Sequence, residues 1–153
     1  MRRCRGLRPR LGSTDMERHM LSNANLVCFS ATTNAEASRV FYESVLGLPL
    51  LEDTPFALVF EVNRTMLRIQ KVREMTPARH TALGWEVSDI RSEIDQLTSK
   101  GIRFERYEGL PQDDRGIWHS PSGAQVAWFK DPDGNILSLT QWPSSGHSKP
   151  AQD

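Results

Sequence analysis

The sequence lacks the features that mark several large protein classes. It has no apolar run approaching the ~18 residues of a membrane span. Its 19 Lys and Arg residues equal its 19 Asp and Glu residues, and a formal net charge of zero does not favour a nucleic-acid or anionic-membrane partner. The start of the chain has no apolar stretch of the kind a secretory signal needs. We therefore expect a cytoplasmic protein whose partner is a small molecule.

Cysteine is also scarce. The two thiols are Cys4, near the start of the chain, and Cys28, inside the apolar stretch 26–29. A thiol in such a stretch serves as a small hydrophobic side chain. We expect neither a disulfide nor a thiolate nucleophile.

The two ends of the chain differ in composition from its middle. Residues 1–22 are rich in Arg and have little apolar periodicity, and Met16 and Met20 stand where later initiation would shorten this arm. We expect a disordered basic arm; the alternative interpretation is an organelle transit peptide. Residues 144–153 have the polar, Pro- and Gly-containing composition of a disordered tail.

Between these ends the chain contains a pattern that occurs twice. In the first copy, about 24–72, the run 25–31 is strand-like, and Thr33 and Glu36 have the spacing of a capping box. The pattern predicts a helix that ends at Gly47. Three strands are expected at 48–51, 56–62 and 65–72, separated by turn-forming residues. The apolar side of the predicted helix consists of Ala37, Val40, Phe41 and Val45.

The second copy, about 80–142, has the same order. A strand over 80–87 is followed by Ser88 and Asp89, which are typical of a helix start, and Gly101 is expected to end that helix. Three strands are expected at 102–106, 124–129 and 136–142, with a polar loop at 108–122. The pentapeptide 131–135 is a strong hairpin signal. Neither copy covers its own sheet, so the pattern predicts one α+β domain over 23–143, built from two βαβββ repeats that form a curved mixed-sheet cup with helices outside.

Two motifs in this frame resemble a known superfamily. They are Phe-Tyr-Glu-Ser-Val-Leu-Gly-Leu at 41–48 and Trp-Phe-Lys-Asp-Pro-Asp-Gly-Asn at 128–135, accompanied by Val-Ser-Asp-Ile at 87–90. Over about 24–142 the chain resembles the vicinal-oxygen-chelate superfamily of glyoxalases, bleomycin-resistance proteins and extradiol dioxygenases. The resemblance implies the βαβββ duplication. It also implies several activities, among which the fold alone does not choose.

Members of that superfamily usually hold a divalent metal with four side chains from the first and last strands of the repeats. Counting from the motifs places these positions at Val27, Gln70, Ala82 and Ser138. Valine and alanine have no ligand atom, whereas a catalytic metal generally needs about three protein ligands. The resemblance therefore implies that the metal site has been lost, and we expect no metal and no cofactor.

Strand alternation from Val27 and Ala82 predicts the residues that line the cup. His80 lies two residues before Ala82 and is either solvated or a substitute metal ligand. Glu86 is either paired to a neighbouring Arg or Lys or a candidate metal ligand or catalytic general base. Arg68 would pair with Glu86 or receive a ligand carboxylate. Trp118 and His119, near Gly116, form a candidate lid, with His119 alternatively exposed. The candidate ligand-binding residues are Phe29, Arg68, Gln70, His80, Glu86, Trp118 and Ser138.

The function expected from these residues is that of a glyoxalase- or bleomycin-resistance-like protein that binds a small molecule in an apolar cup without a metal. The alternative is a metal-dependent lactoylglutathione lyase-like or extradiol dioxygenase-like enzyme with the atypical ligands Gln70, His80 and Glu86. Two further classes stay open: a metal-free enzyme using Glu86 or His119 for proton transfer with Arg68, and an interaction module. Exposed strand edges, which pair in many members of the superfamily, suggest a homodimer.

Overall fold

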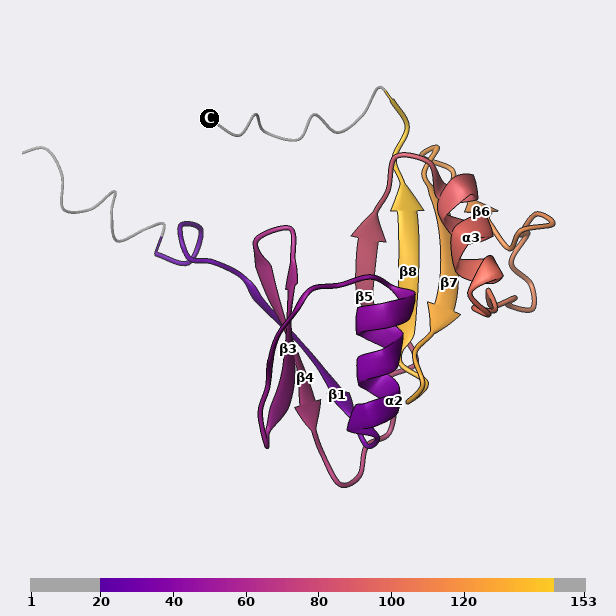
Figure 1. The fold of residues 1–153 in the computed structure, drawn as a ribbon. Helices are drawn as coiled ribbons and strands as arrows, with labels where there is room; N and C mark the ends of the chain where they lie inside the picture. The colour runs from indigo at the N-terminus through magenta and orange to yellow at the C-terminus, as the bar shows by residue number, and fades with distance from the viewer. Residues whose placement is uncertain (1–19, 145–153) are drawn as a thin grey trace, which may run out of the picture.

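The computed structural model describes residues 20–144. Residues 1–19 of the expected basic arm, Cys4 among them, and residues 145–153 of the expected tail lie outside this range. The first repeat contains β1 (Val27–Thr32), helix α2 (Ala35–Arg39) continued by the π-helix η1 (Val40–Val45), β2 (Leu50–Asp53), β3 (Ala57–Val62) and β4 (Thr65–Lys71). Its strands form a sheet in the order β1-β4-β3-β2, in which β1 is parallel to β4 (Figure 1).

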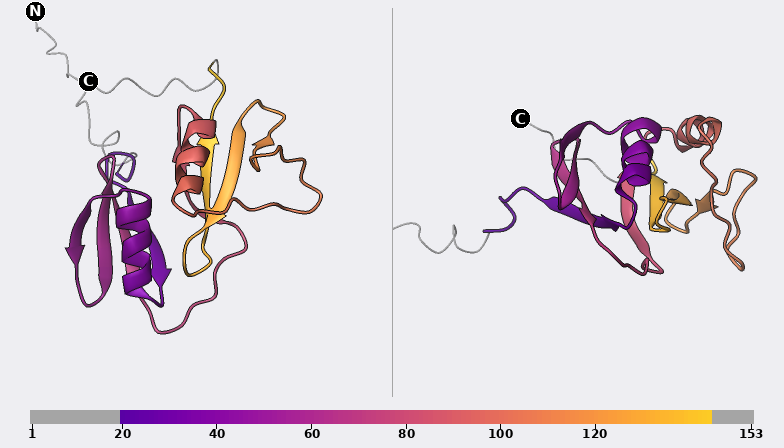
Figure 2. Two further views of the ribbon diagram at one scale, coloured as in Figure 1. Left: turned by 45° about the vertical axis from the view of Figure 1, so that its right-hand side comes forward. Right: turned by 60° about the horizontal axis from the view of Figure 1, so that its bottom comes forward.

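The second repeat reproduces this arrangement. It contains β5 (Thr81–Glu86), helix α3 (Ile90–Ser99), β6 (Trp118–His119), β7 (Gln125–Lys130) and β8 (Ile136–Gln141). The sheet order is β5-β8-β7-β6, with β5 parallel to β8. The two sheets are separate four-stranded units with both helices on one side (Figure 2). The predicted α+β fold with two βαβββ repeats is confirmed.

The edge strand of the second sheet does not lie where the sequence predicted it. Residues 102–106 form no strand, and β6 lies inside the predicted loop 108–122. One backbone bond joins the segment to β7, from the Glu105 N–H to the Trp128 carbonyl at 2.7 Å. The Gln112 side chain takes up groups next to it, since its amide accepts from the Tyr107 N–H at 2.8 Å and donates to the carbonyls of Glu105 and Gly116 at 3.0 and 2.7 Å. It thereby satisfies backbone groups that a ladder would otherwise pair.

The first helix starts differently from the prediction. The N-cap is Asn34, whose Oδ1 accepts from the Ala37 N–H at 3.1 Å. The predicted capping box with Thr33 is wrong, because the Thr33 hydroxyl donates to Asp133 Oδ1 at 2.9 Å. In η1 the Leu46 N–H reaches back five residues to the Phe41 carbonyl at 2.9 Å. This wider turn changes the buried side of the helix, so that Ser38, Phe41 and Tyr42 are buried whereas Val40, predicted to be on the apolar side, is exposed.

The second helix follows the sequence prediction. Asp89 is the N-cap and accepts from the Ser92 N–H at 3.1 Å. Gly101, with φ +92°, takes the left-handed conformation expected just after the helix. Local capping residues therefore determined the limits of α3.

One hydrophobic core joins the two repeats. Each strand alternates, so that one set of side chains packs beneath the helices and the other faces away. Aromatic rings connect the halves, with the Phe41 and Phe129 centroids 6.4 Å apart. The buried core residues of the sheets are Leu58, Phe60, Leu67 and Ile69 in the first and Ala127, Phe129, Leu137 and Leu139 in the second.

Polar contacts also fix the repeats to each other, and they come from the 131–135 turn. Asp133 accepts from the Thr32 hydroxyl at 2.6 Å and from the Thr33 N–H at 2.8 Å. The Asn135 amide donates to the Ala31 carbonyl at 3.1 Å. The predicted hairpin turn is confirmed, and it also binds the end of β1.

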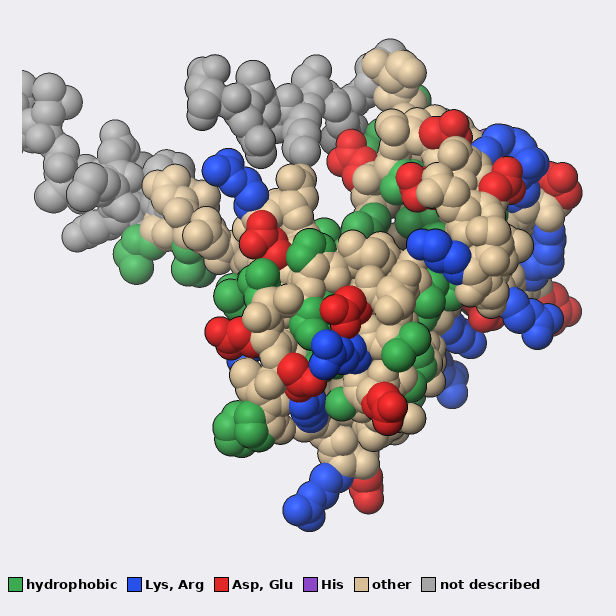
Figure 3. Space-filling model, viewed as in Figure 1, with side chains coloured by type: hydrophobic (Ala, Val, Ile, Leu, Met, Phe, Trp, Pro, Cys, Tyr) green, Lys and Arg blue, Asp and Glu red, His purple; other side chains and the backbone are tan. Residues whose placement is uncertain are grey.

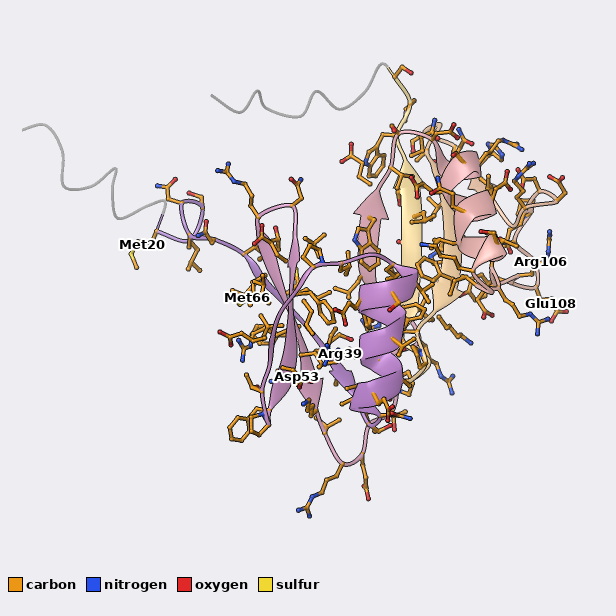
Figure 4. All side chains as sticks on the ribbon, viewed as in Figure 1. Met20, Arg39, Asp53, Met66, Arg106 and Glu108 are labelled. Carbon is orange, nitrogen blue, oxygen red and sulfur yellow. The ribbon has the colours of Figure 1, made fainter. Side chains whose placement is uncertain are left out.

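On the outer edge, α2 is held to the first sheet by an ion pair. Arg39 Nη1 lies 3.4 Å from Asp53 Oδ2 on β2, and the two side chains are close together in Figure 4. Arg39 also pairs with Glu43 one turn along the helix at 2.9 Å. These partners raise the pKa of Arg39, with Glu43 the larger influence.

Candidate functional site

The predicted lining residues of the first repeat lie on the sheet face that points away from the helices. The β1–β4 register places Phe29 beside Arg68 and Ala31 beside Gln70. Phe29 is 55% exposed, Gln70 is exposed and Arg68 is partly buried. The structure therefore brings Phe29, Arg68 and Gln70 together on one accessible face.

The corresponding face of the second repeat carries the other predicted strand residues. The register pairs Gly84 with Ser138 and Glu86 with Thr140. Glu86 is exposed, whereas Ser138 is buried. A Cβ added at Gly84 would lie 2.7 Å from Ser138 Oγ, so the serine packs directly over the glycine.

Three aromatic side chains cluster on this face. Trp128 is paired with Ser138, and its neighbours in β7, Ala127 and Phe129, point into the core, so Trp128 points away from the helices. Its ring centroid lies 6.2 Å from that of Trp118 and 5.6 Å from that of Tyr107. All three are partly buried. The sequence left the orientation of Trp128 open, because strand parity needs a sheet neighbour to fix which side is inside.

The loop that supplies Trp118 is organised by one carboxylate. Asp113 Oδ1 accepts from the N–H groups of Arg115 and Ile117, both at 3.0 Å, and Oδ2 accepts from Arg91 Nη2 at 3.2 Å. Burial by itself would raise the pKa of Asp113, but these amides, together with His119 at 3.5 Å and Arg91, hold that pKa below its usual value. In the loop held in this way, Trp118 lies in β6 and His119 is exposed.

The structure also shows the surroundings of His80 and of Arg68. His80 precedes β5, is exposed, and lies next to a register shift between Thr81 and Leu83. Arg68 Nη1 is 4.0 Å from the sulfur of Met66. Among residues 20–144, neither Arg68 nor Glu86 forms an ion pair.

A cleft of about 660 Å³ lies between the repeats. In Figure 3 a hollow separates the two halves above α2. Apart from Glu86, none of the predicted ligand-binding residues lines the cleft. Sequence reasoning did not find it, because it arises where two repeats meet. It is lined by Leu26, Cys28, Val62, Asn63, Thr65, Leu67, Leu83, Gly84, Trp85, Glu86, Val87 and Ser88.

The donor set at the four metal positions of the superfamily does not fit a divalent metal. Val27 and Ala82 offer no ligand atom, and Ser138 packs against Gly84. Gln70, the remaining candidate ligand, lies on the first sheet, whereas Ser138 lies on the second. Across residues 20–144 no cluster of three or more His, Cys, Asp or Glu side chains could hold a metal ion.

A duplicated βαβββ domain, with aromatic and polar side chains on the sheet faces opposite its helices, defines a class of small α+β proteins. The family model described as Glyoxalase/Bleomycin resistance protein/Dioxygenase superfamily matches residues 26–139. The chain belongs to this superfamily. No curated protein matches the chain significantly.

Solved structures share the fold. A putative glyoxalase family protein from Bacillus anthracis has a TM-score of 0.62 at 17% identity, with 79% of this chain and 96% of that chain covered. A lactoylglutathione lyase from Agrobacterium tumefaciens has a TM-score of 0.60 at 18% identity, with 78% and 93% covered. A glyoxalase/bleomycin resistance protein/dioxygenase from Nocardioides has a TM-score of 0.61 at 20% identity, with 92% and 99% covered. At these identities the likeness shows the fold alone.

Proposed function

We propose that this protein binds a small organic molecule on the sheet faces opposite its helices, and that it does so without a metal. The observation that carries the proposal is the aromatic cluster of Tyr107, Trp118 and Trp128. Small-molecule sites are built mainly from apolar and aromatic walls with a few polar groups that set orientation. Thr140, which is partly buried on the same face, supplies such a group, whereas Ser138 is buried against Gly84.

The face of the first sheet contributes charge and hydrogen-bonding capacity. Arg68 has no carboxylate partner within residues 20–144, so its guanidinium is available to an acidic group of a ligand. Gln70 and Phe29 lie next to it on the same face. A ligand that contacts both faces would therefore combine a planar or aromatic part with a polar or acidic substituent.

A homodimer forms part of the proposal. Val27, Phe29 and Met66 are 39%, 55% and 38% exposed, and the register of β1 and β4 makes them neighbours. Adjacent exposed apolar side chains on a sheet favour coverage by another surface. A second copy would cover them and enclose the ligand.

The names of the structural neighbours offer two directions. One neighbour is called a lactoylglutathione lyase and another a glyoxalase/bleomycin resistance protein/dioxygenase. The residues of this chain favour binding over metal chemistry, since two of the four expected ligand positions are Val27 and Ala82. A cytoplasmic location is also proposed; no helix within residues 20–144 is long and apolar enough to cross a membrane.

The test begins with metal content per chain after gentle purification, followed by thermal shifts with divalent ions and with a library of planar organic acids. We expect substoichiometric metal, no shift with ions, and a shift with some acids that Trp128→Phe and Arg68→Gln each weaken. Trp142→Phe is the matched control, because Trp142 lies beyond the end of β8.

Two outcomes would overturn the proposal. About one metal per chain, lost in Gln70→Ala, His80→Ala or Glu86→Ala, would establish the metal-dependent enzyme instead. A ligand shift that is equal in wild type and Trp128→Phe would remove the aromatic cluster from the site.

A further inference from the structure

The cleft between the repeats lies mainly on the helix side of the sheets, and at the edge strand β5 it shares Gly84 and Glu86 with the opposite face. From the first repeat it is lined by Cys28 and Leu67, whose strand neighbours Val27, Phe29 and Met66 point to the opposite face. The Leu67 side chain belongs to the core beneath the helices, and Cys28 packs against that core. The cleft therefore opens on the helix side of the first sheet, where the edge of β5 closes it.

Part of the cleft wall is apolar, and Asn63, Thr65 and Ser88 add polar groups. Leu67, Leu83, Trp85 and Val87 belong to the core or pack against it, and each presents some surface to the cleft. A volume of about 660 Å³ lies within the usual range for a drug-sized ligand. An apolar body of that size would be desolvated against these walls.

The charge of the cleft is of one sign. Among its lining residues Glu86 is the one carrier of a full charge at neutral pH, and no Lys or Arg lines it. Glu86 is exposed and forms no ion pair within residues 20–144. Glu86 and Trp85 are consecutive in β5 and project to opposite faces of the strand, so they border the cleft from two sides of its edge. A single unpaired carboxylate at that edge favours a cation.

The backbone of β5 supplies further acceptors. β5 pairs with β8 along one edge, and the Val87 N–H donates to the Thr140 carbonyl at 2.9 Å. By strand alternation the backbone groups of Gly84 and Glu86 then point away from β8, toward the free edge that lines the cleft. The Gly84 and Glu86 carbonyls lie on that edge, and a protonated primary amine has three N–H donors to share between such carbonyls and the Glu86 carboxylate.

We propose that this cleft is a second binding site, which takes an amphiphilic organic monocation. Its ammonium group binds Glu86 and the edge of β5, and its apolar body packs on Leu67, Leu83 and Trp85. The carboxylate selects for a positively charged ligand, while the apolar contacts contribute to affinity whatever the charge of the ligand. This site shares Gly84 and Glu86 with the face of the second sheet described above, but it does not include the aromatic cluster.

The test uses three probes with one ring system on the full chain: 1-naphthylmethylamine, which is a cation at neutral pH, neutral 1-naphthylmethanol, and anionic 1-naphthoate. Binding is followed by NMR through the four indole N–H signals, assigned by Trp→Phe variants. We expect the amine to shift the Trp85 signal, the alcohol to do so more weakly, and the acid not to do so. Higher salt should weaken the amine and leave the alcohol unchanged.

Substitution separates charge from shape. Glu86→Gln should weaken the amine about threefold, the scale of an exposed ion pair, and leave the alcohol unaffected. Glu93→Gln, which removes a partly buried carboxylate on α3, outside the cleft, is the control and should change neither.

Equal binding of the three probes, or an amine affinity that Glu86→Gln does not change, would overturn the assignment of a cation. An amine that shifts Trp118 and Trp128 but not Trp85 would overturn the cleft as its site while leaving the aromatic face in place. Failure of every probe to shift any indole signal would overturn the cleft site and would not bear on the metal measurement above.

Discussion

The phenolic Oη of Tyr42 donates to Oδ2 of Asp131 at 2.8 Å, in the interior between the two repeats. Tyr42 comes from the first motif that resembled the superfamily and Asp131 from the second. Asp131 is 5% exposed, and Asn135 donates to it as well, from both its N–H and its side-chain amide. The two motifs are thus partners in one buried contact.

Removal of the Tyr42 hydroxyl should destabilise the protein. In Tyr42→Phe the buried Asp131 carboxylate loses a hydrogen bond, and bonds to charged groups contribute about 1.5–3 kcal/mol. The measurement is the free energy of unfolding in urea. Tyr107→Phe, which changes a partly buried phenol on the other face, is the control and should cost less; equal losses would contradict a special role for the Tyr42 contact.

The same phenol should make stability fall at alkaline pH. Burial raises the pKa of Tyr42 far above its ordinary value of about 10, and the neighbouring Asp131 carboxylate raises the pKa further. Above about pH 10 the unfolded chain loses this proton while the folded chain keeps it. Stability is therefore complete below about pH 10 and decreases as the pH rises, by up to about 1.4 kcal/mol per pH unit from this group.

Urea unfolding of wild type and Tyr42→Phe between pH 9 and 11 checks this dependence. The wild type should lose more stability over that range than the variant. Parallel losses would assign the alkaline sensitivity to other groups.

The close contact of Gly84 with Ser138 predicts a pair of coupled substitutions. A Cβ at position 84 would lie 2.7 Å from Ser138 Oγ, and Ser138 is buried. Gly84→Ala should therefore cost about 1–3 kcal/mol through overpacking. Ser138→Ala removes the clashing oxygen and should restore most of that loss in the double variant.

A double-mutant cycle by thermal unfolding measures the coupling. If the methyl group introduced at position 84 clashes with the Ser138 hydroxyl, the double variant should be more stable than the sum of the two single effects predicts. Additive effects would mean that Gly84 is needed for a reason other than Ser138.

Ser38 offers a route to a more stable protein. Its side chain is fully buried and its Oγ has no hydrogen-bond partner within the described residues. Because an unsatisfied buried polar group costs about 1–3 kcal/mol, Ser38→Ala should raise the melting temperature. Ser44→Ala, at an exposed position of η1, should have less effect; a lower melting temperature for Ser38→Ala would show that the hydroxyl has a partner in solution.

The sequence by itself determined the features that depend on neighbours along the chain. Asp89 and Gly101 set the limits of α3, and Asn63 and Arg64, with φ of 46° and 68°, form the turn expected between β3 and β4. The 131–135 turn and the duplicated order of elements were predicted for the same reason. Caps, turns and hydrophobic periodicity act within a few residues, so one sequence is enough to find them.

Only the tertiary structure decided which distant segments meet. Residues 102–106 have a strand-like pattern, but one backbone bond, from Glu105 to Trp128, joins them to β7. The Glu105 carbonyl bonds to the Gln112 side chain, and β6 forms the edge instead. Thr33 was expected to cap its own helix and instead donates to Asp133, 100 residues away. The cleft that contains Glu86 exists because the edge of β5 lies against the first repeat. Such contacts depend on the packing of two repeats against each other, and no local pattern along the chain encodes that geometry.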